Sequence, residues 1–599
     1  MLLPKLRELQ ASREWCDVFL GYNHNLRIGQ GEFYDMKNMS GDDYPILSPR
    51  GKRGVYASAR KGEITGLIAK DALCYVDGEE FVINGNRLSL GLSVDREKDQ
   101  DGKPNGKIIP KQLVSMGAYV IILPDKKYVN TNDFENDNGD IEAIYESYGT
   151  VTFKMSMLDG DAYDTRTQAV PPTITEKMLS GEEKIPAWID TSSKPHQFKI
   201  YSTSTEEWNA VATTYVRIDA DGIGASFRVG DGVTISGVTA TGATELNTSA
   251  VIVSLGDEFI VVSGTLSAIT HQENPIKVVR AMPDMDFIVE SGNRLWGCKY
   301  GSQGNKVVNE IYASKLGDFR NWNSFQGTAA DSYAVSVGTD GQFTGAVTHL
   351  GYPIFFKENY MHKIYGNYPS NYQVQTTACR GVQKGCEGSI AIVNEVVYYK
   401  ARSGIVGYDG SLPVEVSQAL GDEAYGSAVG GAFGNKYYVS MKDSRGDYHL
   451  FVYDTKRALW HREDDTEVSA FCACRGELYF IDYGKKQIHT VRGSGAPIPD
   501  RVEWEAITGY IGTDSPDKKY ISRLDVRMKL DVGSRVSFYA EYDSSGEWEF
   551  LFNMTGRDLR SFAVPVRPRR ADHLRLRIEG EGDAKIYSIC KTVEWGSDK

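Results

Sequence analysis

One recurring unit constrains the fold of this 599-residue chain more than any other feature. The unit is an apolar strand, a polar turn and an aromatic-rich strand, and it often ends in Asp. Its last four copies begin at residues 343, 389, 428 and 468, about forty residues apart, a spacing typical of propeller blades. The copies are Ile64–Ile83, Leu113–Val129, Phe287–Tyr300 with Glu310–Ala313, Phe343–Tyr365, Ser389–Tyr408, Ala428–Tyr453 and Val468–Val491.

A propeller explains why such a unit repeats. A single four-stranded blade cannot bury both of its faces, so it stacks against neighbours around an axis, and the ring protects its short edges. The 61 Gly and 35 Tyr residues favour tight turns and aromatic strands. Three copies share a turn that contains Asp409, Asp454 or Asp482, where Asp can accept a hydrogen bond from the backbone two residues on. The alternative is a set of unrelated β-meanders.

Two stretches break this rhythm and divide the chain. The first contains short strand-like runs such as Phe227–Gly237, and we interpret it as a small β-barrel or sandwich inserted in a propeller loop. The second holds about seven strand-like runs in its hundred residues, as a β-sandwich does. We therefore predict an all-β chain: a β-propeller with an inserted small β-domain and a C-terminal β-sandwich. The predicted parts are an N-terminal arm with the first propeller blades (1–204), the inserted domain (205–280), the remaining blades (281–495) and the sandwich (500–599).

Charge and cysteine content exclude several classes of protein. The 67 Lys and Arg residues face 80 Asp and Glu residues, which leaves a net charge of −13 and no chain-wide basic footprint for nucleic acid. We therefore expect no sequence-specific nucleic-acid partner. The eight Cys residues lack zinc-ligand spacing and indicate free thiols in a reducing compartment. No apolar run is long enough for a transmembrane helix and no signal peptide is evident, so we expect synthesis in the cytoplasm.

Motifs nominate no catalytic, cofactor-binding or metal-binding residue. The sequence lacks a P-loop, a dinucleotide-binding glycine motif and a nucleophile elbow. The acidic loops around Gly102 and Gly139 lack the EF-hand pattern, which leaves only a looser cation site open. The acidic pairs Asp284/Asp286 and Asp464/Asp465 could serve a glycosidase if their carboxyl groups lay about 5–10 Å apart, although acids in turns are more often solvated. We expect no cofactor.

A cluster of arginines near the C-terminus is the candidate interface. On a strand, Arg575 and Arg577 would share one face, while the aliphatic residues that alternate with them would share the other. The cluster could contact nucleic acid, could be a solvated or charge-guarded strand face, or could meet an acidic partner subunit. We favour the second and third interpretations together. The candidate interface residues are Arg567, Arg569, Arg570, Arg575 and Arg577.

Short motifs also carry a family resemblance. The segment 31–54 looks like the opening of phage and prophage virion proteins, through Met36–Met39 and Leu47–Arg50. The central stretch is similar to the tail-nozzle, or stabilisation, propeller proteins of short-tailed phages, through Ala313–Asp318, Asn321-Trp322, Phe355–Glu358, Cys379–Val382, Gly388-Ser389 and Gly404–Gly410. The resemblance covers residues 31–410 as scattered motifs. It implies a structural ring or hub subunit of the tail and brings no catalytic residues.

These observations lead to one expected function and two alternatives. We expect a non-enzymatic virion structural protein, a tail nozzle, hub or tail-tip subunit, that forms a symmetric homo-oligomeric ring with other tail or connector proteins and resides in the virion tail. The first alternative is a receptor- or glycan-binding tail protein that contacts the host surface, with aromatic stacking from Trp504, Tyr542, Trp548 and Trp595. The second is a propeller glycosidase with acids that converge at the axis.

Overall fold

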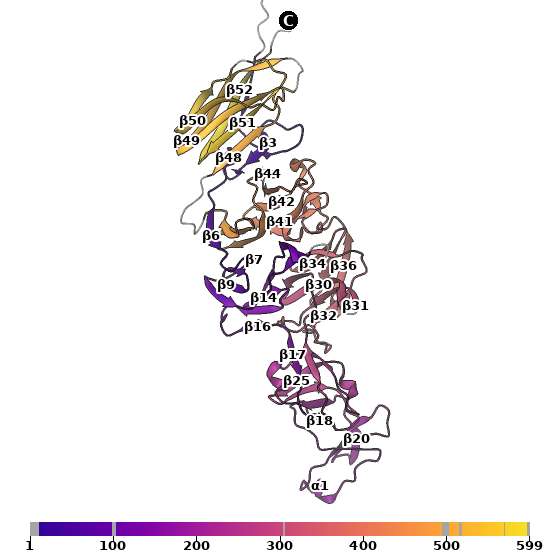
Figure 1. Ribbon diagram of the computed structural model, residues 1–599. Helices are drawn as coiled ribbons and strands as arrows, with labels where there is room; N and C mark the ends of the chain where they lie inside the picture. The colour runs from indigo at the N-terminus through magenta and orange to yellow at the C-terminus, as the bar shows by residue number, and fades with distance from the viewer. Residues whose placement is uncertain are drawn as a thin grey trace, which may run out of the picture.

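The computed structural model describes residues 11–98, 104–303, 306–493, 502–513, 518–567 and 569–595. Strands dominate these residues, and their one α-helix is the short α1 (Glu176–Ser180). The parts follow one another along an elongated molecule, with the C-terminal sheet at one end, the propeller in the middle and the inserted strands at the other end (Figure 1). No helix in the described ranges is long and apolar enough to cross a membrane.

Seven four-stranded antiparallel sheets within the described residues form the propeller. Six of them use strands that are consecutive in the chain, and short 3₁₀ turns connect some of the strands. In chain order the blades are β7 (Ile64–Lys70), β8 (Ala72–Asp77), β9 (Glu80–Ile83) and β10 (Asn86–Ser89); β13 (Gln112–Met116), β14 (Tyr119–Leu123), β15 (Lys127–Asn130) and β16 (Asn138–Asp140); β29 (Phe287–Ser291), β30 (Arg294–Gln303), β31 (Lys306–Ala313) and β32 (Tyr333–Ser336); β33 (Phe343–His349), β34 (Tyr352–Lys357), β35 (Tyr360–Tyr365) and β36 (Gln373–Ala378); β37 (Ala391–Val393), β38 (Val396–Ala401), β39 (Gly404–Tyr408) and β40 (Val414–Glu415); β41 (Gly426–Phe433), β42 (Lys436–Lys442), β43 (Tyr448–Asp454) and β44 (Leu459–Arg462); and β45 (Val468–Cys474), β46 (Glu477–Asp482), β47 (Gln487–Thr490) and β6 (Gly54–Ser58).

The blades pack face to face because each has apolar residues on both sides. Phe81 of the first blade and Val120 of the second share one hydrophobic cluster, and Ile311 and Phe355 join the third blade to the fourth in the same way. The seventh blade shares a cluster with the first, so the ring is closed. A small hairpin of β11 (Arg96–Lys98) and β12 (Pro104–Ile108) follows the first blade.

An N-terminal strand completes the last blade. β6 pairs antiparallel with β47, and Gly54 lies opposite Thr490. The ring is therefore closed by two segments more than 400 residues apart, as the Thr490–Gly54 separation of 436 shows. Ring closure of this kind ties the seventh blade to the start of the chain.

The insertion is longer than predicted. It starts at β17 (Ala143–Glu146) rather than at residue 205, because β18 (Val151–Ser156) pairs with β23 (Tyr215–Asp219) and so belongs to the same sheet. The other strands of this eight-stranded sheet are β24 (Gly232–Ser236), β25 (Ser249–Gly256), β26 (Phe259–Ser263), β27 (Thr270–Gln272) and β28 (Lys277–Arg280). A separate four-stranded sheet at the far tip holds β19 (Thr165–Gln168), β20 (Ala187–Asp190), β21 (Gln197–Ser202) and β22 (Glu207–Ala210).

The C-terminal part also differs from its predicted boundaries, because N-terminal strands complete it. Three strands from the predicted arm pair into its sheet, in the order β1-β52-β49-β51-β48-β3-β2, with β50 on β49. The two halves of the long strand β49 pair with different neighbours, β52 and β51, and their buried residues enter one core, which gives a sandwich. The strands are β1 (Ala11–Cys16), β2 (Gly21–Tyr22), β3 (Glu32–Lys37), β48 (Glu503–Thr508), β49 (Lys519–Tyr542), β50 (Glu549–Val564), β51 (Leu574–Glu581) and β52 (Ala584–Trp595).

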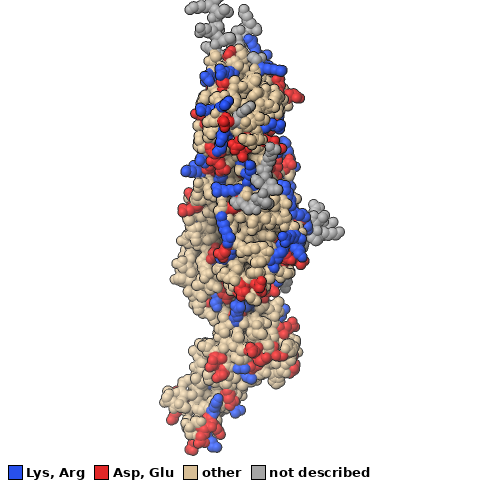
Figure 2. Space-filling model, turned by 90° about the vertical axis from the view of Figure 1, so that its left-hand side faces the viewer, with Lys and Arg blue, Asp and Glu red and all other residues tan. Residues whose placement is uncertain are grey.

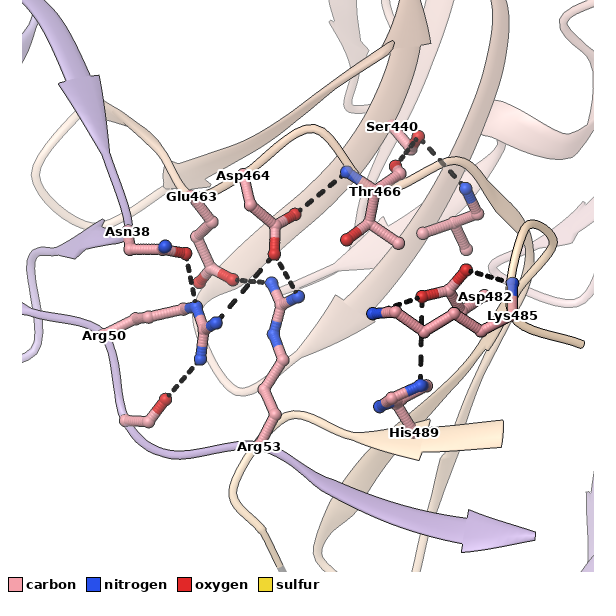
Figure 3. A network of polar contacts seen from close by, with 12 residues as sticks. Asn38, Arg50, Arg53, Ser440, Glu463, Asp464, Thr466, Asp482, Lys485 and His489 are labelled. Carbon is pink, nitrogen blue, oxygen red and sulfur yellow. Dashed lines mark hydrogen bonds and ion pairs between the residues drawn. The ribbon is translucent and has the colours of Figure 1, made fainter. Parts of the chain in front are cut away.

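A buried polar network joins the sandwich to the propeller (Figure 3). The chain runs from β3 through the short pair β4 (Met39–Ser40) and β5 (Ser48–Pro49) to β6. Between β5 and β6, Arg50 donates to Asn38 and Arg53 donates to both Glu463 and Asp464, which follow β44. The network fixes the crossing segment against the sixth blade.

Candidate functional site

Strand β51 presents two arginines on the outer face of the C-terminal sheet. Leu574, Leu576 and Ile578 point inward and are buried, so Arg575 and Arg577 lie on the opposite face. Neither arginine is freely solvated, since their side chains are 18% and 23% exposed. The surroundings that cover them define the site.

Arg575 is held by one carboxylate and three rings. Its Nε and Nη2 donate to Glu541 Oε2 at 2.8 and 2.6 Å. Its guanidinium carbon lies 4.8 Å from the ring centroid of Tyr510, 5.6 Å from that of Tyr34 and 5.7 Å from that of Trp548. These distances are within the range of cation–π attraction.

Arg577 has a similar environment one step along the strand. Its Nε lies 3.0 Å from Glu579 Oε1 and 4.0 Å from Glu505 Oε2. Its guanidinium carbon lies 4.7 Å from the ring centroid of Tyr539 and 4.9 Å from that of Trp548. The Trp548 ring therefore contacts both arginines.

The rings and the two arginines form a band across the sheet. Phe550 extends it, because its ring meets that of Tyr539 at 5.6 Å and 69° while Phe550 remains 56% exposed. The members come from β50, β49, β51, β3 and the segments beside β48 and β50, so the band runs across neighbouring strands. We call it the aromatic–arginine band: Tyr34, Tyr510, Tyr539, Trp548, Phe550, Arg575 and Arg577.

One carboxyl group beside the band has a raised pKa. Burial raises the pKa of Glu505, and the nearby charges of Asp35 and Glu579 add to the effect, although Arg577 opposes it. Glu505 and Glu579 lie directly opposite each other on β48 and β51. Folding therefore favours the protonated form of Glu505 more than the unfolded chain does.

The other predicted interface arginines lie at the edge of the band. Arg569 pairs with Glu549 at 2.5 Å and lies 5.2 Å from the ring centroid of Tyr542. Arg567 and Arg570 are exposed on the loop between β50 and β51. Because acids of the same chain already pair with Arg569, Arg575 and Arg577, an acidic partner is not needed to balance them. Figure 2 likewise shows basic and acidic side chains interspersed over the face that it draws.

The four aromatic residues proposed for stacking have different positions. Trp504 is buried, with its indole N–H donating to Gly582 O at 3.0 Å, and Tyr542 is buried as well. Trp548 lies on the outer face, within the band. The side chain of Trp595 lies outside the described residues. Tyr34, Tyr510, Tyr539 and Phe550 are not among the residues predicted from the sequence. Tyr539 could have been, because it alternates with the apolar, buried residues of β49 and must therefore point outward.

The two acidic pairs considered for glycosidase chemistry are engaged by cations. Asp284 pairs with Lys126 and Asp286 with Lys299, each at 2.8 Å. Burial raises the pKa of Asp464, but the charges of Arg53 and Arg50 outweigh it and the net shift is downward. Asp465 also has a lowered pKa, through hydrogen bonding to His449 and its contact with Arg462. A general acid needs the opposite shift.

Metal ligands do not cluster in the part of the chain that the structure describes. No group of three or more His, Cys, Asp or Glu side chains there could hold a metal ion.

No family model matches the sequence, and no curated protein matches it. Solved structures do match. An exo-β-1,3-galactanase from Phanerochaete chrysosporium, solved with galactose, is 8% identical, covers 51% of this chain and 94% of its own, and has a TM-score of 0.20. An engineered GH43 enzyme with endo-xylanase and exo-arabinofuranosidase activity is 9% identical, covers 52% and 98%, and has a TM-score of 0.20. An acylaminoacyl peptidase from Pyrococcus horikoshii is 8% identical, covers 48% and 46%, and has a TM-score of 0.23.

These comparisons correct the expected function. The matches above are two glycoside hydrolases and a peptidase, which contradicts the predicted non-enzymatic tail-nozzle or hub subunit. That role and the prediction that the chain is not an enzyme are therefore not retained. Likeness at TM-scores near 0.20 transfers no residue role, substrate or activity to this chain. The predicted fold class, a β-propeller with further β-rich parts, is confirmed by the strand order.

Proposed function

We propose that the protein binds glycans through the aromatic–arginine band. The observation that carries this proposal is the position of Arg577, whose guanidinium lies against the rings of Trp548 and Tyr539 while its Nε meets Glu579 at 3.0 Å. Rings and paired polar groups thus share one outward face of a sheet.

The chemistry of a sugar ring matches this combination. A sugar has faces of C–H groups, which pack on aromatic rings, and a rim of hydroxyl groups that both donate and accept hydrogen bonds. Arginine supplies up to five donors in a fixed plane and glutamate supplies acceptors only, so an Arg–Glu pair can serve both roles of a hydroxyl group. Glu541 is only 4% exposed and serves to hold Arg575, so the geometry of this arginine is set before a ligand arrives.

The extent of the band favours a chain of sugars over a single one. Neighbouring strands lie about 4.8 Å apart, so a band that crosses from β50 to β3 extends for roughly 20 Å. A surface of this length can contact several sugar units, and contacts to successive units add to the affinity.

Affinity electrophoresis of the full chain tests the proposal. The protein is run through native gels that contain xylan, laminarin, dextran or a galactan, and is incubated with insoluble chitin, cellulose and peptidoglycan. We expect retention by at least one of these glycans. Trp548→Ala should weaken this retention by about tenfold, or ~1.4 kcal/mol, because it removes the ring that both arginines contact.

Trp15→Ala is the matched control, because Trp15 is 53% exposed on β1 and contributes no ring to the band. Circular dichroism and gel filtration establish that each variant is folded. Retention of wild type by none of these glycans, or an equal loss in the Trp15 and Trp548 variants, would contradict the proposal.

A further inference from the structure

The four-stranded sheet at the far tip has two unlike faces. Ala187, Ile189 and Phe198 point into the core of the inserted part. Trp188 and Tyr201 lie on the other face, because side chains alternate along β20 and β21. Trp208 of β22 lies directly opposite Tyr201, so its side chain is on the same face as Trp188 and Tyr201. This second aromatic face is at the opposite end of the molecule from the C-terminal sheet (Figure 1).

The three rings of this tip face are contiguous. Trp188 and Trp208 meet with ring centroids 5.6 Å apart at 74°, and Tyr201 and Trp208 meet at 5.5 Å and 64°. The indole N–H of Trp188 donates to Gln168 O at 2.7 Å. Trp208 is half-buried, and its indole N–H donates to no group in the described ranges. A donor beside an accessible ring is therefore available to a ligand.

Fixed polar groups lie among the rings. Lys199 Nζ lies 4.8 Å from the ring centroid of Trp188 and 2.8 Å from Asp190 Oδ2. Asp190 also accepts from Ser192, and these contacts lower the pKa of Asp190 to about 2. The charges of Lys199 and Asp190 therefore balance. The Asp190 side chain is only 4% exposed, so Lys199, at 19% exposure, is the member of the pair that can reach a ligand.

Part of the tip face is open to solvent: Tyr201 and Trp208 are half-buried, whereas Trp188 beneath them is buried at 5% exposure. Arg166 lies opposite Trp188, and Gln197 lies opposite Asp190, so both share the face of the rings. Both side chains are exposed, as is Gln168, which also lies opposite Asp190. Planar amide and guanidinium groups thus lie around the accessible rings of Tyr201 and Trp208.

We infer that the tip face is a second carbohydrate-binding surface. Its occupant is a glycan, because the face combines contiguous rings, a free indole N–H, planar amides and an internally neutral ion pair, and these match the C–H faces and hydroxyl rim of a sugar. The face shares no residue with the aromatic–arginine band, so the inference does not rest on the proposed function. With both surfaces occupied, the protein would connect two glycan chains, or two points of one chain.

The test isolates the tip face in the full chain by first removing the band. A Tyr539→Ala/Trp548→Ala variant is examined for residual retention by the glycans named above. We expect residual retention, and we expect the further changes Tyr201→Ala and Trp208→Ala to abolish it. Trp208→Phe, which keeps a ring at this position, should preserve most of it and thereby separate loss of the ring from loss of the fold.

Tyr148→Ala is the matched control on the inserted part, because Tyr148 is 67% exposed and contributes no ring to the tip face. The inference is overturned if the band variant shows no residual retention or if the tip changes leave that retention unaltered. It is also overturned if Tyr148→Ala reduces retention as much as Tyr201→Ala and Trp208→Ala do. If the tip changes alone reduce retention while Trp548→Ala does not, the tip surface stands and the proposed function of the band fails.

Discussion

Arg53 Nη2 lies 2.5 Å from Glu463 Oε2, and both side chains are buried, at 6% and 5% exposure. Arg53 immediately precedes β6, the strand that closes the ring, and Glu463 immediately follows β44 of the sixth blade. The Arg53 guanidinium also meets Asp464 Oδ2 at 2.5 Å. One arginine thus fixes the N-terminal segment at the place where it passes from the sandwich to the propeller (Figure 3).

Breaking this pair should destabilise the propeller. Arg53→Met leaves the buried carboxylate of Glu463, and the 17% exposed carboxylate of Asp464, without their main cation, so we expect the free energy of unfolding to fall by about 3–5 kcal/mol. Urea unfolding measures the loss, and hydrogen exchange should show faster opening of β6 and β47. Lys52→Met is the control: Lys52 is 44% exposed and lies 3.4 Å from Asp583, so its loss should cost less than about 1 kcal/mol. If the two variants lost the same free energy of unfolding, the buried Arg53 pair would be no more stabilising than the exposed Lys52 pair.

The propeller could be predicted from sequence because each blade is a local unit. Apolar strands, tight turns and their spacing lie within a stretch of about forty residues and repeat along the chain. Closure of the ring is different, since β6 and β47 come from opposite ends of the chain. Nothing in the sequence of Gly54–Ser58 specifies Gln487–Thr490 as its partner, and the same holds for β3 and β48 of the sandwich. Pairing across such separations depends on the assembled fold.

The candidate site could be predicted in part for the same reason. The alternation of Arg575 and Arg577 with aliphatic residues is visible within one strand and gives the correct outward face. Their partners come from other segments: Glu541 from β49, Tyr34 from β3 and Tyr510 from the residues after β48. Only the strand order brings these residues together. The sequence of β51 alone therefore predicts a basic stripe without acidic partners, whereas in the folded sheet Arg575 and Arg577 are paired with glutamates.

A close backbone contact in the propeller makes a second prediction. A Cβ on Gly381 would lie 1.8 Å from the backbone oxygen of Lys357, while the Gly381 N–H donates to Glu358 O at 3.0 Å. Gly381→Ala must therefore push two segments apart, and we expect a loss of about 1–3 kcal/mol in urea unfolding. Gly338→Ala, where nothing lies within 4 Å of the added Cβ, should leave stability nearly unchanged. A neutral Gly381→Ala would show that the backbone there relaxes freely.

The raised pKa of Glu505 makes stability depend on pH in a defined direction. The folded protein holds the Glu505 proton more tightly than the unfolded chain does, so this group contributes stability at low pH that is lost as pH rises through its folded pKa. Glu505→Gln removes the charge that burial disfavours. We therefore expect it to be more stable than wild type at pH 7 and equal to it or less stable at low pH.

Urea unfolding at a series of pH values measures this difference. Glu503→Gln, at an exposed position on the same strand, is the matched control. A Glu505 variant that is less stable than wild type at pH 7 would mean that attraction to Arg577 outweighs burial of the charge.

The last prediction separates the geometry of Arg577 from its charge. Arg577→Lys keeps the positive charge but loses the planar guanidinium that lies against Trp548 and Tyr539 and meets Glu579. If the band binds glycans as proposed, this change should weaken retention by about tenfold, or ~1.4 kcal/mol, without altering the net charge. Arg567→Lys and Arg570→Lys serve as controls, because both residues are exposed on the loop beside β51. Equal weakening of retention in all three variants would mean that the effect does not depend on which arginine is replaced. Unchanged retention in Arg577→Lys would mean that a positive charge at this position is sufficient. Only selective loss at Arg577 supports recognition by the arranged plane of rings and guanidinium.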